Sequence, residues 1–343
     1  MATSGIELSL SPGSNLPAVS VVLPVLNEEL HLANAVNSIL SQDYAGTLEI
    51  ILALGPSKDK TDEIAQHLAS SDPRITLVDN PSGKTAAGLN AAINKSKNPV
   101  IVRVDAHAEL QRNYISLAIE VMKSSGAVNV GGIMGAQGVS TFEKTVARAM
   151  RSPLGVGASR FHTGGDSGYV DTVYLGVFLR TAVIAVGGFD ERFIRAQDWE
   201  LNFRLRERGG KIFFDPRLEV TYRPRPNLSA LAKQYFEYGS WRREVMRRHP
   251  ETRTRKSALR YYAPPLAVLL IVLGKIIGTI GFVMGNALVW GYVLPIGYVA
   301  LTLVSSLTLV KRAGSGALWL PIVLATMQLS WGVGFLTSRP KSH

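Results

Sequence analysis

Asp105 and His107 are metal-capable side chains one residue apart, and they directly follow the run VIVRV at 100–104. This run is apolar apart from Arg103, which is typical of a buried strand. In an open α/β sheet the ligand lies beyond the carboxyl ends of the strands, so both side chains would face the crevice. We interpret them as the place where a divalent cation holds a diphosphate. The alternative is that Asp105 caps a turn and His107 is an ordinary surface residue.

Asp198 is the second acidic candidate. It lies in the run QDWE at 197–200, which opens a helical pattern. We place Asp198 at the N-cap of this helix and Glu200 in its first turn, where the helix dipole favours negative charge. Capping alone would explain an aspartate here. The two roles are compatible, because the positive end of the helix would keep Asp198 ionised and able to act as a base near neutral pH.

Lys84 lies in the segment SGKT at 82–85, which imitates the end of a phosphate-binding loop. The complete G-x-x-x-x-G-K-T pattern needs glycine where the chain has Val78, so the sequence argues against an ATP-hydrolysing P-loop. Lys84 would still lie near a helix start, where its charge and the free backbone N–H groups favour a phosphate. A solvated lysine in a turn explains the residue equally well.

Strand, polar turn and helix repeat along the first part of the chain and would position these residues. The predicted strands are 19–23, 48–54, 75–78 and 100–104, and helical patterns cover 30–40, 60–70, 85–95 and 113–125. This alternation predicts an α/β fold with a Rossmann-like, mostly parallel sheet, right-handed crossovers and flanking helices. Further strands are expected at 128–133, 169–179, 211–214 and 218–223.

Glycine is concentrated at 131–138 and again at 152–168. A long stretch of such composition inside a compact domain is typical of a mobile functional loop. We interpret the second stretch as a lid or a loop that faces the acceptor of the reaction. Plain disorder is the competing interpretation.

Three apolar segments lie at 263–284, 287–310 and 317–336, and each has about the 20 residues needed to span hydrocarbon. Basic residues crowd at 242–260, and Lys311 and Arg312 form a short basic loop. Positive-inside topology then places the N-terminal domain and this loop in the cytoplasm and the last few residues outside. Lys275 interrupts the first segment and is expected to face a helix interface or a lipid headgroup. A tilted or partly interfacial first segment is the alternative, and we expect all three segments to span.

The 343-residue chain has a net charge of +11 and no cysteine. Without cysteine neither disulfides nor thiolate metal sites can form, so a metal needs oxygen and imidazole ligands. Because the basic residues gather beside the membrane segments, we assign the charge to lipid headgroups and not to nucleic acid. We expect a flexible leader at 1–17, an α/β domain at 18–227, a basic amphipathic linker at 228–262 and a membrane domain at 263–343.

The segment 228–249 is predicted to be an amphipathic helix rich in aromatic and basic residues. Such a helix suits a membrane surface, with rings at headgroup level and basic groups on phosphates. A helix packed on the soluble core is the rival interpretation. The side chains that we assign to the acceptor or to lipid are Tyr235, Tyr238, Trp241 and Arg242.

The chain resembles the family 2 glycosyltransferases of the GT-A fold. Six motifs carry the resemblance: VSVVLPVLNEE, NPSGKTAAGLNAAI, VIVRVDAHAEL, VDTVYLGVFLR, GGFDERFIRAQDWELNFRLRERGGKI and LAKQYFEYGSWRRE. They occur in the family's order, from about residue 19 to 260. More narrowly, the chain is similar to the membrane-bound, succinoglycan ExoA-type glucosyltransferases of exopolysaccharide assembly, and this likeness continues into the hydrophobic tail.

The resemblance implies roles for individual residues. The donor-binding set is Pro24, Leu26, Glu28, Lys84, Arg103 and Asp105. Asp105 would be the first carboxylate of the D-x-D element, and Asp198 would be the base that deprotonates the acceptor hydroxyl.

Two positions depart from the family pattern. His107 replaces the second aspartate of D-x-D, which leaves a site with less negative charge for Mg²⁺ or Mn²⁺ and shifts its preference toward Mn²⁺. Glu109 is a further candidate ligand. Leu54 and Gly55 stand where two aspartates usually help to read the base and ribose, so a nucleotide other than uridine stays open.

The resemblance implies an inverting transfer of a hexose such as glucose from a nucleotide sugar, expected to be UDP-linked, to a saccharide on polyprenyl diphosphate. The setting would be exopolysaccharide or cell-surface glycan synthesis at the cytoplasmic membrane. One carboxylate base is enough for a single displacement, which inverts the anomeric carbon. Two rival functions remain open: a synthase that makes a polyprenyl-phosphate monosaccharide, and a non-catalytic, membrane-tethered scaffold that binds nucleotide sugars.

Overall fold

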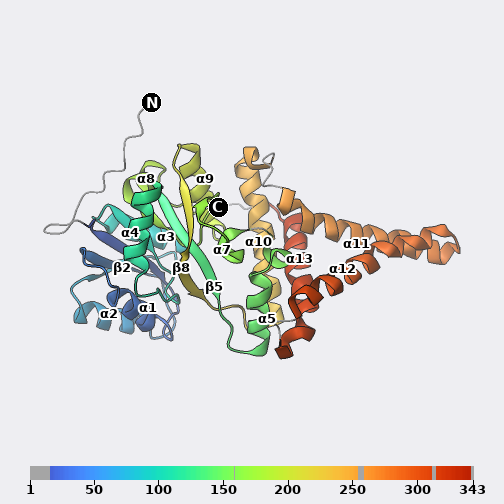
Figure 1. The fold of residues 1–343 in the computed structure, drawn as a ribbon, viewed down its shortest axis with the longest axis horizontal. Helices are drawn as coiled ribbons and strands as arrows, with labels where there is room; N and C mark the ends of the chain where they lie inside the picture. Colours follow the sequence, from blue (N-terminus) through green and yellow to red (C-terminus); the bar gives the residue numbers. More distant parts are fainter. Residues whose placement is uncertain (1–15, 158, 254–258, 311–313, 341–343) are drawn as a thin grey trace. The chain divides into compact units, whose positions relative to one another are not determined.

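The structure is a computed structural model that describes residues 16–157, 159–253, 259–310 and 314–340 (Figure 1). Most of the expected leader at 1–17 therefore lies outside the described residues. The chain divides into two compact units. The sheet unit runs to Gly135 and resumes over Arg160–Tyr222, and the helical unit comprises Ala136–Ser159 and the chain from Arg223 onward. This division differs from a continuous domain at 18–227, because 136–159 belongs with the C-terminal helices.

An eight-stranded sheet forms the centre of the sheet unit, with strand order β3-β2-β1-β4-β7-β5-β8-β6. Its first half is parallel and consists of β1 (Val19–Val25), β2 (Leu48–Leu54), β3 (Ile75–Asp79) and β4 (Val100–Arg103). The helices between and after these strands are α1 (Leu32–Leu40), α2 (Thr61–Ser71), α3 (Thr85–Lys95) and α4 (Tyr114–Ser125). The predicted α/β fold with a mostly parallel sheet is confirmed.

Both faces of the sheet are covered by apolar side chains. On β1, Val21 and Leu23 belong to one core cluster and Val22 belongs to the other. Successive side chains of a strand point to opposite faces, so a strand buried on both sides needs this continuous apolar run. Because β1, β2, β3 and β4 are parallel, their carboxyl ends point the same way, and the turns that follow them lie at one edge of the sheet.

The second half of the sheet is less regular. It contains β5 (Asn129–Ala136), β6 (Gly168–Tyr169), β7 (Val177–Leu179) and β8 (Ile212–Tyr222), together with α7 (Arg160–Thr163), α8 (Arg180–Ala185) and α9 (Gln197–Glu207). The strand β7 runs antiparallel to both β4 and β5. Two strand predictions were wrong in extent. The stretch 169–179 is divided into β6 and β7, and 211–214 and 218–223 form the single strand β8.

Glycines in β5 allow another strand to approach closely. A Cβ atom on Gly132 would lie 1.8 Å from the carbonyl oxygen of Leu218 in β8, and one on Gly135 would lie 2.2 Å from Glu219 Oε1. The glycine-rich stretch at 131–138 is thus largely strand. The stretch 152–168 contains two short helices, α6 (Pro153–Val156) and α7, and its role as a lid or a loop that faces the acceptor stays a prediction.

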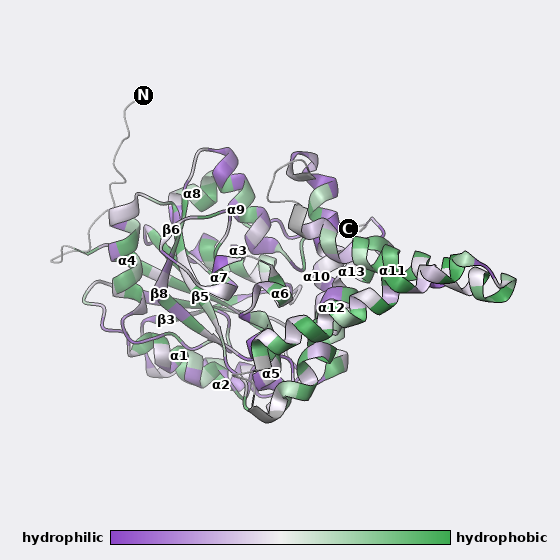
Figure 2. Ribbon diagram, turned by 45° about the vertical axis from the view of Figure 1, so that its right-hand side comes forward, coloured by the Kyte–Doolittle hydropathy of each residue, from purple (hydrophilic) through white to green (hydrophobic). Residues whose placement is uncertain are grey.

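The helical unit contains α5 (Thr141–Met150), α6, α10 (Leu228–Arg248), η1 (Pro250–Arg253), α11 (Leu259–Met284), η3 (Ala287–Tyr292), α12 (Val293–Val310), η4 (Gly314–Trp319) and α13 (Leu320–Thr337). Three stretches are long and apolar enough to cross a membrane: Tyr261–Met284, Ala287–Leu309 and Gly316–Thr337. Hydrophobic residues predominate along them in Figure 2.

Small residues join α11 to the segment that follows it. A Cβ atom on Gly274 would lie 2.6 Å from the carbonyl oxygen of Gly291, and one on Gly281 would lie 2.0 Å from the backbone nitrogen of Val289. Close backbone approach through glycine is the usual way in which apolar helices associate in lipid. The segments α11, η3 and α12 therefore form a helical hairpin, with its turn at Gly285, where φ is +61°.

Candidate active site

Asp105 and Asp198 share one partner, the guanidinium of Arg103. Arg103 Nη2 lies 3.1 Å from Asp105 Oδ1, and Arg103 Nη1 donates a short hydrogen bond to Asp198 Oδ1. The arginine side chain is only 4% exposed, whereas the two aspartates are 21% and 25% exposed. One cation between two carboxylates leaves a formal charge of −1, so the group can still attract a second cation.

Arg103 is the last residue of β4, and the sheet determines where its side chain starts. Its backbone N–H donates to the carbonyl oxygen of Gly176, just before β7. Its guanidinium carbon lies 5.8 Å from the centroid of the Phe189 ring. A buried guanidinium is costly unless charged partners compensate it, so its two carboxylate partners are what makes this position tolerable. The buried arginine therefore sets the spacing of both acidic side chains.

Asp198 is brought to Arg103 by α9. The N-cap of this helix is Ala196, in the left-handed region with φ of +63°, and Asp198 is the second residue inside the helix. The prediction that Asp198 is the N-cap was wrong, and the N-cap makes no side-chain hydrogen bond. Asp198 nevertheless lies in the first helical turn, where free N–H groups and the helix dipole favour a carboxylate.

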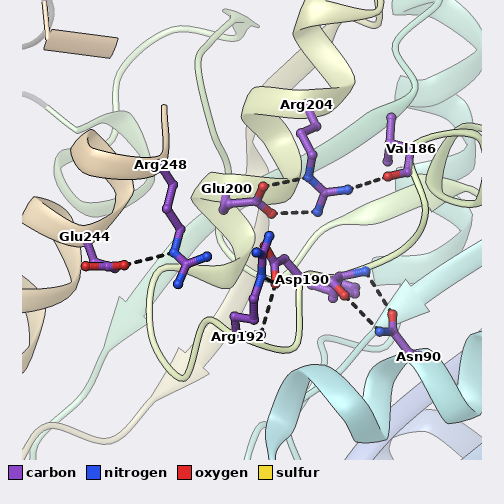
Figure 3. Close-up of polar contacts among 9 residues, drawn as sticks. Asn90, Val186, Asp190, Arg192, Glu200, Arg204, Glu244 and Arg248 are labelled. Atoms are coloured by element: carbon purple, nitrogen blue, oxygen red, sulfur yellow. Dashed lines mark hydrogen bonds and ion pairs between the residues drawn. The ribbon is translucent and has the colours of Figure 1, made fainter. Parts of the chain in front are cut away.

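Glu200 has a different environment from Asp198, although it is only two residues away. Its side chain is 1% exposed, and both of its carboxylate oxygens accept hydrogen bonds of 2.6 Å from Arg204 (Figure 3). Arg204 also donates to the carbonyl oxygen of Val186, at 2.6 Å. Glu200 is thus occupied in holding α9 to the loop after α8, which leaves Asp198 as the accessible acid of this helix turn.

Asn90 is a residue that the sequence analysis missed. Its side-chain amide donates to the carbonyl oxygen of Phe189, and its amide oxygen accepts from the Phe189 backbone N–H, both at 2.8 Å (Figure 3). Gly188 adopts φ of +73°, and a Cβ atom there would lie 2.6 Å from Asn90 Oδ1. The reciprocal bonds therefore tie α3 to the loop whose Phe189 ring lies near Arg103. The sequence contained one indication of this role, namely a polar asparagine next to the apolar Leu89 in a helix that packs on the core.

His107 is paired with Glu28. Its Nδ1 lies 2.9 Å from Glu28 Oε1, and its side chain is 42% exposed. Within the described residues no three His, Asp or Glu side chains are grouped closely enough to hold a metal ion. Asp105, His107 and the further candidate Glu109 therefore do not form a three-residue ligand group, and a site made by Asp105 and His107 stays a prediction. A cation at Asp105 would have to complete its shell with ligand oxygens and water, as Mg²⁺ commonly does beside substrate phosphates.

The expected nucleotide-binding residues lie at the end of β1. A Cβ atom on Gly55 would lie 3.1 Å from Leu26 Cδ1, and one on Gly83 would lie 3.4 Å from Leu26 Cδ2. Glycine at these two positions thus makes room for Leu26 between the turns that follow β2 and β3. Pro24 packs toward α3, because its Cβ would lie 3.3 Å from a Cβ added at Gly88.

The loop after β1 is fixed by hydrogen bonds to the loop after β2. Asn27 adopts φ of +55°, and its Oδ1 accepts from the backbone N–H of Lys58 at 2.8 Å. The Glu28 N–H donates to Thr61 Oγ1 at 2.7 Å, and the Thr61 hydroxyl in turn donates to Asp59. This hydroxyl is the main cause that lowers the pKa of Asp59. The rim that carries Glu28 is therefore held by local polar contacts.

Lys84 stands at the N-cap position of α3, and its side chain is exposed. Its backbone is held on both sides: Ser82 Oγ accepts from the Lys84 N–H, and Asn80 Nδ2 donates to the Lys84 carbonyl oxygen, each at 3.1 Å. The predicted helix start is confirmed. A contact between Lys84 and a phosphate stays a prediction.

The aromatic and basic face of α10 is not a free surface. Tyr235 and Trp241 are each 4% exposed and Arg242 is 7% exposed. The Arg242 guanidinium lies 3.6 Å from the centroid of the Tyr261 ring, and the hydroxyl of Tyr238 accepts from Gln234. We therefore correct the assignment of Tyr235, Trp241 and Arg242 to lipid, because buried side chains do not contact lipid headgroups. Tyr238 is partly buried.

Comparison with known proteins places the chain among glycosyltransferases. The profile of the family Glycosyl transferase family 2 matches residues 20–187. The chain is 30% identical to the succinoglycan biosynthesis protein ExoA of Rhizobium meliloti over 320 residues, which cover 92% of this chain and 93% of that protein.

Two further similarities concern a lipid-linked acceptor and the fold. The dolichyl N-acetyl-alpha-D-glucosaminyl phosphate 3-beta-D-2,3-diacetamido-2,3-dideoxy-beta-D-glucuronosyltransferase of Methanococcus voltae is 25% identical over 65% of this chain and 72% of its own. The solved structure of the mannosyltransferase PcManGT from Pyrobaculum calidifontis, in complex with GDP-Man and Mn²⁺, has a TM-score of 0.60 at 18% identity, covering 96% of this chain and 89% of that one. This structural likeness confirms the expected GT-A fold.

Proposed function

We propose a particular reaction for this chain, which belongs to glycosyl transferase family 2. The reaction is the inverting transfer of a hexose from a nucleotide sugar to a saccharide on polyprenyl diphosphate. UDP-glucose is the proposed donor, and exopolysaccharide or cell-surface glycan synthesis is the proposed setting. The observation that carries the proposal is the buried Arg103, which holds Asp105 and Asp198 together.

Asp105 is proposed to act on the leaving group. The bond between the anomeric carbon and the diphosphate breaks with its electron pair on the phosphate oxygen, so negative charge grows there. Asp105 lies at the carboxyl end of β4, where ligands of open α/β sheets bind. Arg103 beneath it and Lys84 at the start of α3 supply positive charge for the departing diphosphate.

A divalent cation fits this position. Arg103 engages one Asp105 oxygen in a bond of 3.1 Å, and the net charge of the three side chains is −1. One carboxylate combined with phosphate oxygens is an ordinary coordination environment for Mg²⁺ and also accepts Mn²⁺. When bound, the cation would neutralise the charge that develops on the leaving diphosphate.

Asp198 is proposed to take the proton of the acceptor hydroxyl. The hydroxyl oxygen attacks the anomeric carbon from the side opposite the diphosphate and forms the new glycosidic bond, while its proton passes to the Asp198 carboxylate. Glu200 is enclosed by Arg204 and is not available as a covalent nucleophile. A single displacement follows, and it inverts the anomeric configuration.

A lipid-linked acceptor is supported by the composition of the helical unit. Three of its stretches could cross a membrane. ExoA belongs to succinoglycan biosynthesis, and the Methanococcus voltae relative is named for a dolichyl phosphate-linked sugar. We infer that this chain likewise uses an acceptor sugar attached to a polyprenyl lipid.

The decisive experiment uses membranes that contain the full-length chain, supplied with a panel of radiolabelled nucleotide sugars and a polyprenyl-diphosphate saccharide. We expect UDP-glucose to label the lipid and the product mass to rise by one hexose. A lipid monophosphate that carries a single sugar would identify the rival synthase instead. Absence of turnover with every donor, although UDP binds, would identify a scaffold.

A further inference from the structure

We propose that α13 does not cross the membrane: it lies along the membrane surface beside α10, and only the α11–α12 hairpin enters the hydrocarbon. This topology has two crossings in place of the predicted three. It places the end of the chain on the same side of the membrane as α10. All of the evidence comes from contacts within the helical unit.

The first line of evidence is that α13 packs on α10 with backbone contact. A Cβ atom on Gly239 would lie 1.9 Å from the carbonyl oxygen of Trp331, and one on Gly334 would lie 2.0 Å from that of Phe236. Each helix thus has a glycine where the other approaches most closely. In Figures 1 and 2 the two helices run side by side. The hairpin also touches α13, since the Tyr298 hydroxyl donates to Gln328 Oε1 at 3.0 Å, but its tip extends away from both helices.

The beginning of α13 has similar neighbours. Gly316 in η4 lies against Thr145 of α5, and Phe142 of α5 meets Trp319 edge to face, with ring centroids 5.5 Å apart. Further along, Gln328 Nε2 donates to the carbonyl oxygen of Leu154 in α6 at 2.8 Å. From its first turn to its last, α13 therefore has α5, α6 or α10 beside it.

The second line of evidence is the charge on those neighbours. Within its 21 residues α10 carries seven charged side chains, namely Lys233, Glu237, Arg242, Arg243, Glu244, Arg247 and Arg248. If α13 spanned the bilayer, α10 would have to lie in the hydrocarbon along with it. Each charge there costs on the order of 3 kcal/mol even on the lenient insertion scale. By contrast, Lys275 is the single charged side chain in the sequence from 261 to 310.

The third line of evidence is the way in which the end of α13 is held. Arg243 Nη1 donates to the carbonyl oxygens of Phe335 and Leu336, at 2.8 and 2.5 Å. Arg247 donates to the Ser338 carbonyl, and Ser338 Oγ donates to the Ser240 carbonyl at 3.1 Å. These arginines compensate the negative end of the α13 dipole. The C-terminal end of α13 thus stays at the level of α10.

The face of α13 that remains open suits the boundary between headgroups and acyl chains. Ile322 and Val333 of α13 are exposed, and so are Leu318 and Trp319 of the preceding η4 and Phe236 of α10. Of the 18 most apolar consecutive residues in Gly316–Thr337, 33% are buried. The corresponding share is 17% in Tyr261–Met284 and 0% in Ala287–Leu309. A helix that packs on charged neighbours with one side and shows apolar and tryptophan side chains on the other is typical of an in-plane position.

The chain has no cysteine, so single cysteines report topology without background. Three variants of the full-length protein are required: Ser70→Cys in the sheet unit, Met284→Cys at the hairpin turn, and Pro340→Cys after α13. All three positions are exposed. Intact cells are treated with a membrane-impermeant maleimide, and a second sample is treated after permeabilisation.

We expect Pro340→Cys and Ser70→Cys to behave alike, with labelling at least tenfold stronger after permeabilisation, and Met284→Cys to be labelled in intact cells. Labelling of Pro340→Cys from the same side as Met284→Cys would overturn the proposal, because α13 would then cross. Labelling of Met284→Cys from the side of Ser70→Cys would refute a hairpin that crosses the bilayer. Neither readout depends on which sugar is transferred.

Discussion

Arg103 in the sheet unit and Arg243 in the helical unit both join segments more than 90 residues apart in the sequence, but their partners differ. Arg103 bonds to two carboxylates that are still about a quarter exposed. Arg243 bonds to two backbone carbonyl oxygens at the end of α13. The first arginine thus belongs to a charged group that a ligand can enter, and the second completes a helix end.

The difference shows how one side-chain type serves chemistry in one unit and architecture in the other. Carboxylates can exchange protons and cations, so a cluster around Arg103 can respond to a substrate. Backbone carbonyls do not exchange protons near neutral pH, and these two accept hydrogen bonds from Arg243, so its bonds fix the position of the helix end. Changes at the Arg103 group should therefore affect turnover before stability, and changes at the α10–α13 contact should do the reverse.

Asp198→Asn gives the largest expected effect. It keeps the shape of the side chain but removes the base, so transfer should fall about 10²–10⁴-fold. Binding of UDP, measured by titration calorimetry, should change less than about threefold, because Asp198 is assigned to the acceptor. Glu207→Gln, an exposed change in the same helix, is the matched control. An equal loss of UDP binding would show that Asp198 is structural.

Arg103→Lys tests the shared partner directly. Lysine keeps the charge but lacks the planar fork that reaches two carboxylates at once. We expect kcat to fall about 10²-fold while the KM for the acceptor changes little. Arg74→Lys, on an exposed ion pair with Asp72, is the control and should be neutral. A wild-type kcat in Arg103→Lys would contradict a role for the planar guanidinium group in turnover.

Gly239→Val tests the other side of the comparison. Because its Cβ would lie 1.9 Å from a backbone oxygen, α10 and α13 must separate, at a cost of about 3 kcal/mol in the free energy of unfolding. Thermal unfolding in detergent measures this loss. Gly297→Ala is the control, since nothing lies within 4 Å of its added Cβ. Unchanged stability in Gly239→Val would contradict the close packing.

Asn90→Ala removes the link between α3 and Phe189. Two hydrogen bonds to the backbone are lost, so the free energy of unfolding should fall by about 1–2 kcal/mol. If the loop positions Phe189 against Arg103, kcat should fall several-fold as well, and Asn90→Asp should recover only part of it. A stability loss with unchanged kcat would limit Asn90 to an architectural role.

His162 gives a smaller, pH-dependent effect. Burial lowers the pKa of this histidine from 6.5 to about 3, and its Nδ1 has no hydrogen-bond partner among the described residues. The folded form binds the proton less readily than the unfolded form, so stability is complete above pH 6.5 and falls as the pH drops toward 3. The slope is at most about 1.4 kcal/mol per pH unit. His162→Phe should flatten it in thermal unfolding between pH 7 and 5.

The sequence by itself determined the parallel half of the sheet. Apolar runs at β1, β2 and β4 and the helical pattern at 85–95 are local signals, and they specify where each strand ends. They therefore also placed Asp105 and Lys84 at one edge. The period of the pattern could not specify the other half, because β7 runs antiparallel between β4 and β5 and short strands carry little periodicity.

Only the tertiary structure decided which side chains meet. Arg103 and Asp198 are 95 positions apart in the sequence, and Glu28 and His107 are 79 positions apart. No local spacing could therefore show that the side chains of either pair meet. The same holds for α13. The composition of α13 shows only that the segment is apolar enough to enter hydrocarbon. Its position relative to the membrane also depends on the charged helix that packs beside it, and the hydropathy of a single segment carries no information about that neighbour.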